Sequence, residues 1–389
     1  MNAEVSNTLA DNFEKQYRSP RVPNFYVRAA TQQDDAQLGK LISEHMPSNG
    51  MILSYERNPS YISASKTQYN RPDIRVVVPE HQPNKVVGMM NLGWKYCFVN
   101  GKSDVLRYVS DLRLDQDYRG QKILHLLMDY LQDELPKDGM LQSIVLEGNV
   151  AAREILHQKR KGFPTPYHYD DIQTFMVSQV QKPASYGLFK FERLTADKIP
   201  AVNDFVQSMQ AHYNFLPNYD FSGLLDGQHA FWRGLKLEDF HLAYNLDNQL
   251  VGIYGLWNQK SFKQSRVVHY SWPMKFAKPF YNVYAQVKGA LLLPKQDGAI
   301  NYLMLHSALC HPQHLQVFSS LLYHAKCQMH QYRKRAFCIT LAKNDPRIQQ
   351  MQRTHSYTIQ AIHSFHSFQG NPFECFDRSK ISYFECGRI

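Results

Sequence analysis

Long hydrophobic runs are missing from this sequence of 389 residues. A membrane-spanning helix needs about 18 consecutive apolar residues, and the longest candidate, Gly289–Leu293, stops at Pro294. Residues 1–20 are polar and lack the apolar core of a secretory signal. We therefore expect a cytoplasmic protein with no membrane partner.

Cysteine is scarce, with six residues scattered over the chain. Small secreted domains that depend on disulfides carry a much denser set, so we expect free thiols. A pair between Cys375 and Cys386 is the alternative left open. The histidines and cysteines of the second half lack a compact CxxC or HxxxH pair, so we predict no metal site. The residues weighed and set aside as ligands are His306, Cys310, His311, His314, His324, Cys327 and His330.

Acidic residues are few in the second half. Residues 184–389 contain 22 basic residues (Lys and Arg) but only 13 acidic ones (Asp and Glu). Residues 1–183 contain 22 basic and 21 acidic residues. Clustered positive charge attracts anions, which favours an acidic or phosphate-bearing partner. A solvated basic surface is the open alternative. The basic run Tyr332–Arg335 is typical of a helix end, so nucleic acid is a less favoured partner.

The chain is longer than one compact core of about 100–200 residues, and it contains an internal repeat. Matching positions of the two halves are 164 residues apart near the start of each half and 195 residues apart further on; we call this separation the repeat offset. The second half therefore has about 31 extra residues between Ile253 and Ile300. This interval predicts an inserted amphipathic helix. The matching segments are Phe25–Thr31 with Phe189–Thr195, Asn84–Gly88 with Asn248–Gly252, and Ser143–Asn149 with Cys338–Asn344.

Each half has the pattern of a mixed α/β fold, in which short β-branched runs alternate with amphipathic helices. The expected strands are Phe25–Ala30, Arg75–Val78, Lys85–Trp94, Val105–Leu114 and Ser143–Leu146. The expected helices run from Asp34 to near His45, from Gln121 to Glu134 and from Val150 to Lys159. The predicted limits are 1–22 for a flexible lead-in, 23–182 and 188–389 for two domains, 183–187 for a linker, and about 273–293 for the inserted helix.

Two motifs carry a family resemblance. Asp111–Met128 is a strand, an Arg-Gly loop and an amphipathic helix, and Val145–Asn149 leads into a helix that ends at Gly162-Phe163. Together they resemble the GNAT (Gcn5-related N-acetyltransferase) superfamily over about residues 23–180. The resemblance implies two tandem GNAT-like domains, each a mixed β-sheet flanked by helices. The second is expected to be degenerate, because His314 and Leu315 stand where the first half has Arg119 and Gly120.

The Arg-Gly loop suits a pyrophosphate on physical grounds. A helix N-terminus offers unpaired N–H groups and a positive dipole end, and Arg119 and Lys122 add charge. The superfamily has further glycines where this chain has Lys122 and Leu124. The resemblance implies acetyl-CoA or another acyl-CoA as co-substrate. The residues it assigns to CoA are Leu112, Arg113, Leu114, Arg119, Gly120, Gln121, Lys122, Ile123, Leu124 and Asn149.

Three residues are candidates for catalysis. Asp111 and Glu147 lie near the carboxyl ends of strands that would flank the acyl group, so either could be the general base. Arg113 could equally hold Asp111 in a structural ion pair. The tyrosine that serves as acid in the superfamily is replaced by Leu156, and the adjacent His157 is the substitute considered, with a plain helix-surface role as the alternative.

The sequence is compatible with two different functions. The first is an acyl-CoA-dependent N-acyltransferase, N-acetyltransferase above all, in which an amine attacks the CoA thioester held by the first half. The alternative is a non-catalytic tandem module that senses acyl-CoA or binds an acidic partner or RNA. The retained Arg119-Gly120 pair favours the enzyme, whereas the altered glycines and the missing tyrosine favour the module.

Overall fold

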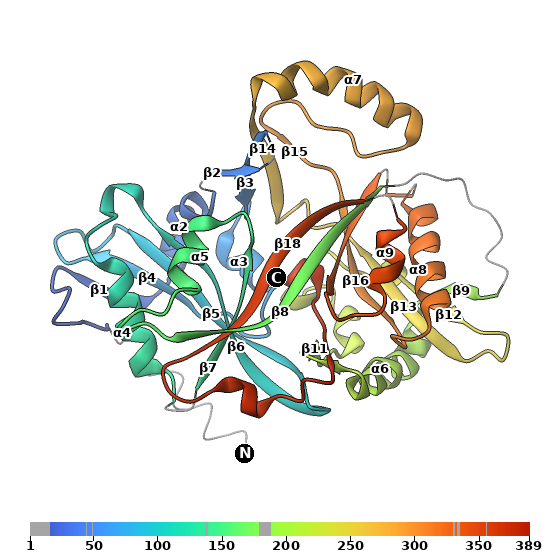
Figure 1. Cartoon of the computed structure of the whole chain (residues 1–389), viewed down its shortest axis with the longest axis horizontal. Coiled ribbons are helices and arrows are strands. Elements are labelled where there is room, and N and C mark those ends of the chain that lie inside the picture. The colour runs from blue at the N-terminus through green and yellow to red at the C-terminus, as the bar shows by residue number, and fades with distance from the viewer. Residues whose placement is uncertain are drawn as a thin grey trace.

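One mixed sheet runs through both halves of the chain, and helices pack against it (Figure 1). This α/β architecture confirms the predicted fold class. The predicted linker, residues 183–187, lies outside the described residues. The structure, a computed structural model, describes residues 16–43, 45–48 (backbone only), 50–136, 139–178, 188–329, 331–332, 335–354 and 356–389.

The main sheet has 13 strands within the described residues. Their order is β1 (Phe25–Ala29), β4 (Ile74–Pro79), β5 (Gly88–Val99), β6 (Lys102–Leu114), β7 (Met140–Leu146), β18 (Ser356–Ser367), β8 (Thr165–Ser178), β17 (Ala336–Ala342), β16 (Leu303–Cys310), β13 (Leu250–Trp257), β12 (Phe240–Tyr244) and β9 (Lys190–Arg193), with β11 (Leu216–Pro217) beside β5. The two halves exchange strands at the centre. Strand β18 comes from the second half but lies between β7 and β8, and β8 in turn pairs with β17. The sheet is therefore continuous across the sequence repeat.

Helices connect these strands, and in the described part of the chain none is long and apolar enough to cross a membrane. The α-helices are α2 (Asp35–Ile42), α3 (Tyr61–Ser65), α4 (Ile123–Glu134), α5 (Val150–Leu156), α6 (Ile199–Ser208), α7 (Trp272–Lys288), α8 (Leu315–Gln328) and α9 (Ile348–Gln352). Short 3-10 helices span Gln32–Asp34, Gln116–Tyr118, Ala196–Lys198, Met209–Ala211, Phe221–Leu224, Ala230–Trp232, Leu237–Asp239, Pro372–Cys375 and Cys386–Arg388.

Helices α4 and α8 occupy corresponding places in the two halves. Each follows the fourth strand of its half and packs an apolar face on the sheet, because its apolar residues recur at helical spacing. Leu126 and Leu127 of α4 are buried, as are Leu321 and Leu322 of α8. The two pairs are separated by 195 residues, which is the repeat offset of this part of the chain.

Several boundaries differ from the expected ones. Helix α2 ends at Ile42, before His45, and α5 ends at Leu156, before Lys159. The inserted helix α7 begins at Trp272, because Pro273 fits a first helical turn, and it ends at Lys288, before Gly289, which has a left-handed φ of 67°.

A second, four-stranded sheet joins the two halves and was not expected. Its strand β3 from the first half pairs with β14 from the second, and residues about 210 apart meet there, such as Glu56 and Gln264. Pairing over such a distance leaves no local pattern in the sequence. The strands are β15 (Gly298–Ala299), β14 (Gln264–Tyr270), β3 (Met51–Glu56) and β2 (His45–Ser48), and a two-stranded sheet contains β10 (Tyr213–Asn214) and β19 (Ile381–Ser382).

Segments near both ends of the described chain pack against the body. Tyr17 forms an antiparallel bridge with Val27, and Ser19 and Val22 are buried. Residues 383–388 are buried at the centre, where the C mark lies between the two halves (Figure 1). This last segment forms walls of the site described next.

Candidate active site

Strands β6 and β7 separate toward their carboxyl ends. They pair in parallel only at Arg107 with Leu141 and at Tyr108 with Gln142, although both continue beyond this point. Backbone N–H and C=O groups that leave a ladder need other partners, so the space between separating strands can hold an extended ligand. We call this space the first gap. Helices α4 and α5 begin just after the two strands and therefore start at its open end.

The loop before α4 places a helix N-terminus at the first gap. Gly120 has a φ of 83° and Lys122 a φ of 61°, so the chain passes through two left-handed conformations. The space around Gly120 is open, because an added Cβ would have no atom within 4 Å. Arg119, Gly120, Gln121 and Lys122 are exposed, whereas Ile123 is buried and anchors the helix. The loop is exposed, and anion binding by its backbone stays a prediction.

Asp111 lies at a β-bulge of β6. Its φ is 53°, and the register of pairing with β5 shifts beside it. The bulge breaks the alternation that would place Arg113 on the same face, and Arg113 donates instead to the carbonyl of Leu112 at 3.0 Å. The predicted alternative of an Asp111–Arg113 ion pair is therefore wrong. Oδ2 of Asp111 accepts a hydrogen bond from the buried hydroxyl of Tyr61 at 2.9 Å, and burial together with the Asp111 charge raises the pKa of Tyr61 well above its usual value.

The other predicted catalytic residues are placed differently. Glu147 follows β7 and is exposed. His157 follows α5, its Nδ1 lies 3.4 Å from Oγ of Ser364, and burial lowers its pKa, so the ring is neutral at pH 7. Asn149 caps α5 by accepting a backbone hydrogen bond of 3.2 Å. In the described part of the chain, no hydrogen bond joins Glu147 or His157 to Asp111.

In the second half, side chains fill the corresponding space between β16 and β17, which we call the second gap. These strands also pair at only two positions before they separate. The amide of Ser307 donates to the buried Glu385 at 2.8 Å. Arg347, which is buried and pairs with Asp345 at 2.6 Å, donates to the carbonyl of Ala308 at 2.8 Å. The chain's own carboxylate and guanidinium occupy the place that a ligand would take.

The bulges also correct the register of the repeat. Ser307 has a φ of 47° and lies where the pairing of β16 with β13 shifts, as Asp111 does in β6. The offset in this strand is therefore 307 minus 111, or 196, and Asp111 corresponds to Ser307 rather than His306. Side-chain similarity could not show this, because the bulge is a property of the backbone.

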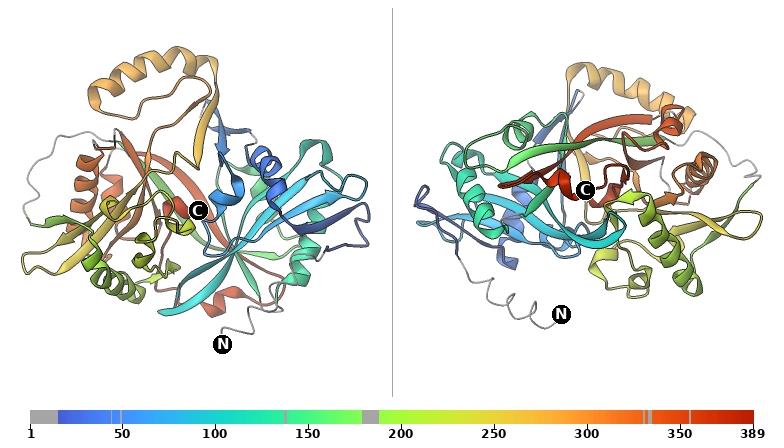
Figure 2. Two further views of the ribbon diagram at one scale, coloured as in Figure 1. Left: turned by 180° about the vertical axis from the view of Figure 1, so that it is seen from behind. Right: turned by 60° about the horizontal axis from the view of Figure 1, so that its bottom comes forward.

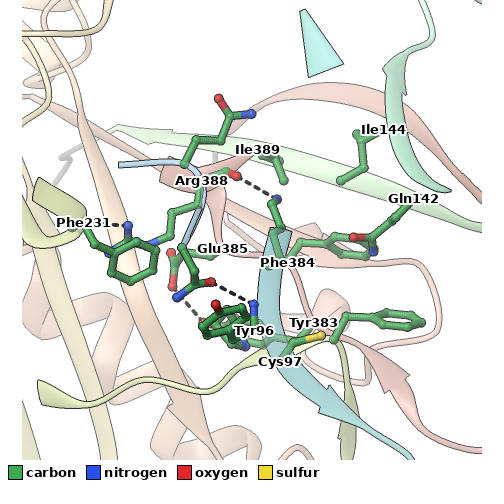
Figure 3. Close-up of a pocket in the computed structure, with 15 residues that line it drawn as sticks. Tyr96, Cys97, Gln142, Ile144, Phe231, Tyr383, Phe384, Glu385, Arg388 and Ile389 are labelled. Carbon is green, nitrogen blue, oxygen red and sulfur yellow. Dashed lines mark hydrogen bonds between the residues drawn. The ribbon is translucent and has the colours of Figure 1, made fainter. Parts of the chain in front are cut away.

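A small central cavity of about 40 Å³ lies where the two halves meet (Figure 3). Gln142, at which β6 and β7 separate, lines it, so the cavity begins at the base of the first gap. Nζ of Lys95 donates to the carbonyl of Arg388 at 2.9 Å, and burial lowers the pKa of Lys95 to about 7. Glu385 lies in the same wall, and burial raises its pKa to about 7. Two groups that titrate near neutrality thus share this cavity.

A second cavity, of about 150 Å³, has a basic wall and is called the basic cavity. Arg57, Lys260 and Lys263 line it, and no aspartate or glutamate of the described residues does so. Nζ of Lys263 donates to the carbonyl of Gly387 at 3.0 Å. Burial, reinforced by the Arg57 charge, lowers the pKa of Lys263 well below its usual value, whereas the Asp111 charge acts in the opposite direction, so Asp111 is close to this wall. The aromatic and apolar part of the wall comes from Tyr55, Trp257, Ile300, Tyr302 and Met304.

The sequence analysis missed Lys95, Lys263 and Glu385. The sequence does contain a feature that could have identified Lys95, because this lysine interrupts an otherwise apolar run. No sequence feature identifies Glu385, because its partner Ser307 is 78 residues away and its contacts depend on the packing of both halves.

The first half carries a match to a known family. Residues 41–163 match the model of the acetyltransferase (GNAT) family. This segment is similar to GNAT-family domains. The match includes the first gap, the loop of Gly120 and helix α5. A search of curated proteins finds no match to the sequence.

Solved structures share the fold over both halves. The chain is similar to N-myristoyltransferase of Saccharomyces cerevisiae with bound myristoyl-CoA, with a TM-score of 0.57 and 8% identity over 93% of this chain and 87% of that one. A GCN5-related N-acetyltransferase from Sphaerobacter thermophilus has a TM-score of 0.51 and 11% identity, over 93% of this chain and 99% of that one. The glucosamine N-acetyltransferase region of a fungal multi-domain β-N-acetylglucosaminidase has a TM-score of 0.57 and 10% identity, over 88% of this chain and 38% of that one. At these identities the similarity establishes a GNAT fold that extends beyond the first domain.

Proposed function

We propose that this protein is an acyl-CoA-dependent N-acyltransferase that moves an acyl group, an acetyl group in the first instance, from CoA to an amine. The contrast between the two gaps carries the proposal. The first gap leads to the exposed loop of Gly120, whereas Glu385 and Arg347 fill the second. This contrast supports one CoA site per chain, in the first half.

The bulge indicates how the thioester oxygen is held. In the second gap the amide at this position, that of Ser307, donates to a carboxylate oxygen. Asp111 occupies the equivalent position, and no side chain of the described residues accepts a hydrogen bond from its amide. We assign the thioester oxygen to the backbone of Asp111–Leu114, where N–H donors aimed at the developing oxyanion lower the barrier.

Asp111 is the base in this proposal. The amine nitrogen attacks the thioester carbon, a C–N bond forms, the C–S bond breaks, and CoA leaves as a thiolate that takes a proton from solvent. The proton of the attacking nitrogen passes to the Asp111 carboxylate, which the hydroxyl of Tyr61 holds in place at 2.9 Å. Glu147 is the second candidate, since it lies just beyond β7 and faces solvent.

The basic cavity is the proposed acceptor site. Arg57, Lys260 and Lys263 line it, and in the described structure no ion pair joins them to a carboxylate. An amine that also bears a carboxylate or phosphate would be attracted by these cations. Nearby cations lower the pKa of the acceptor's amine and so favour its neutral, nucleophilic form.

Calorimetric titration with CoA, acetyl-CoA and myristoyl-CoA tests the CoA site, the last because a structural neighbour binds it. We expect micromolar binding at one site per chain. In Gly120→Glu a carboxylate would meet the pyrophosphate, and we expect affinity to fall about 100-fold, which corresponds to about 3 kcal/mol. Gly120→Ala is the matched control, because it carries the same left-handed φ without the charge.

Each outcome has a distinct meaning. Unchanged binding in Gly120→Glu would show that this loop does not hold CoA. Binding that depends on Gly120, but with no acyl transfer to a panel of carboxylated and phosphorylated amines, would favour the non-catalytic acyl-CoA-sensing module.

A further inference from the structure

Helix α7 leaves a row of large apolar side chains uncovered. It lies at the rim of the molecule, away from the main sheet, in Figure 1 and in the left view of Figure 2. Among its 17 residues only Ala285 is buried. Trp272, Phe276, Phe280, Val283 and Val287 are each between 67% and 79% exposed. Apolar patches of this kind mark interaction sites.

The five exposed side chains form one stripe, the α7 stripe. At about 100° per residue, positions 272, 276, 280, 283 and 287 fall within about 80° of the helix circumference, and they extend over about 22 Å of its length. The rings of Trp272 and Phe276 stack, with centroids 6.1 Å apart. The stripe is therefore narrow, continuous and rich in aromatic rings.

The charge around the stripe has one sign. Residues 271–297 contain four lysines, one aspartate and no glutamate, and α7 itself contains no acidic residue. In the helical projection Lys275 lies on one side of the stripe and Lys288 beyond its other side. An apolar face that contains tryptophan and phenylalanine, next to lysines, is the pattern of a helix that lies in a lipid interface.

The opposite face of α7 is tied to the protein. Asn282 exchanges hydrogen bonds of 2.9 and 3.0 Å with the backbone of Leu293, and Arg335 donates to the carbonyl of Ala285 at 3.2 Å. The helix is thus held with the stripe directed outward, which removes the ordering cost that a free segment would carry on binding.

We propose that α7 binds the surface of an anionic phospholipid bilayer, with the stripe inserted among the acyl chains and the lysines at the headgroups. This departs from the expectation of no membrane partner, and it concerns a helix that lies on a membrane rather than one that spans it. The helix is inserted between β14 and β15, and Ser265 and Ile300, at the ends of these strands that lie away from α7, line the basic cavity.

Co-sedimentation of the full-length protein with vesicles tests the proposal. We expect binding to phosphatidylcholine vesicles that contain about 30% phosphatidylglycerol, and weaker binding without the anionic lipid or in about 0.5 M NaCl. The variant Phe276→Ser with Phe280→Ser should lower the partition coefficient about 10-fold or more. Lys275→Gln with Lys288→Gln should remove the preference for the anionic lipid.

Leu246→Ser is the control, because Leu246 is 81% exposed and lies in the turn between β12 and β13. It should bind vesicles like the wild type. All of these side chains are exposed, so unchanged thermal unfolding verifies the fold of each variant. Failure of the wild type to bind anionic vesicles, or equal binding by the Phe276→Ser, Phe280→Ser variant, overturns the proposal. A dimer in sedimentation velocity that this variant abolishes, without vesicle binding, assigns the stripe to a second copy of the chain instead.

Discussion

Replacing Glu385 by glutamine tests the electrostatics at the centre of the molecule. Glu385 is 4% exposed and accepts hydrogen bonds from the Ser307 amide at 2.8 Å and from the hydroxyls of Tyr219 and Tyr383 at 3.2 Å each. Burial raises its pKa to about 7, although these hydrogen bonds and the Arg388 charge act in the opposite direction. Glutamine keeps the side-chain shape and an acceptor oxygen but cannot ionise.

The sign of the effect follows from the two pKa values. An unperturbed glutamate has a pKa of 4.5, against about 7 in the folded protein. Between these values the folded state holds one proton more than the unfolded chain, so the free energy of unfolding falls as the pH rises from 4.5 to 7. A difference of about 2.5 in pKa corresponds to about 3 kcal/mol. Above pH 7 the ionised Glu385 lowers the free energy of unfolding of the wild type by this amount, whereas the glutamine variant has no such loss.

Urea unfolding of both proteins at about pH 5 and about pH 8 measures the effect. We expect the stability of Glu385→Gln relative to the wild type to rise by about 2.5 kcal/mol between the two conditions. Lys95 also titrates near pH 7, and the Glu385 charge raises its pKa, so the same comparison is repeated in a Lys95→Met background to remove its contribution. Glu238→Gln is the control, since the Glu238 side chain is 61% exposed. A stability difference for Glu385→Gln that does not change with pH would refute the reasoning.

Two further predictions concern catalysis. Asp111→Asn should lower kcat about 100-fold or more with little change in the KM of the acceptor, because it removes a base and not a binding contact. If Glu147→Gln abolishes turnover and Asp111→Asn does not, steady-state kinetics would move the base to Glu147. Lys263→Met should raise the KM of a carboxylated or phosphorylated amine about 10-fold and leave that of an amine without an acidic group unchanged, because the acceptor's negative charge holds Lys263 in its charged form against burial and a charged hydrogen bond contributes about 1.5–3 kcal/mol. Equal KM values for both acceptor classes in the variant would remove Lys263 from the acceptor site.

Much of the local structure could be predicted from the sequence. The apolar spacing of Gln121–Glu134 predicts α4, and the β-branched runs predict β4, β5 and β6, because these patterns reflect which face of an element is buried. The repeat predicts that α4 and α8 correspond, and the insertion between Ile253 and Ile300 contains α7. The loop of Arg119 and Gly120 was identified by its residue types alone.

The candidate site was only partly predictable. Asp111 was chosen for its place near the end of a strand, but its bulge and its hydrogen bond with Tyr61 depend on the pairing of β6 with β5 and on the packing of α3. The ion pair with Arg113 was wrong because the bulge interrupts the alternation of side chains. Glu147 and His157 lie where their elements end, without hydrogen bonds to Asp111 in the described structure.

The sequence by itself determined the α/β class, the repeat, the exposed loop that begins α4 and the basic character of the second half, because each depends on residue type and short-range spacing. Only the tertiary structure decided that β18 and β8 are exchanged between the halves, that Glu385 and Arg347 fill the second gap, and that Arg57, Lys260 and Lys263 line one cavity. These contacts join residues that are distant in the chain, and they exist only when both halves complete one sheet.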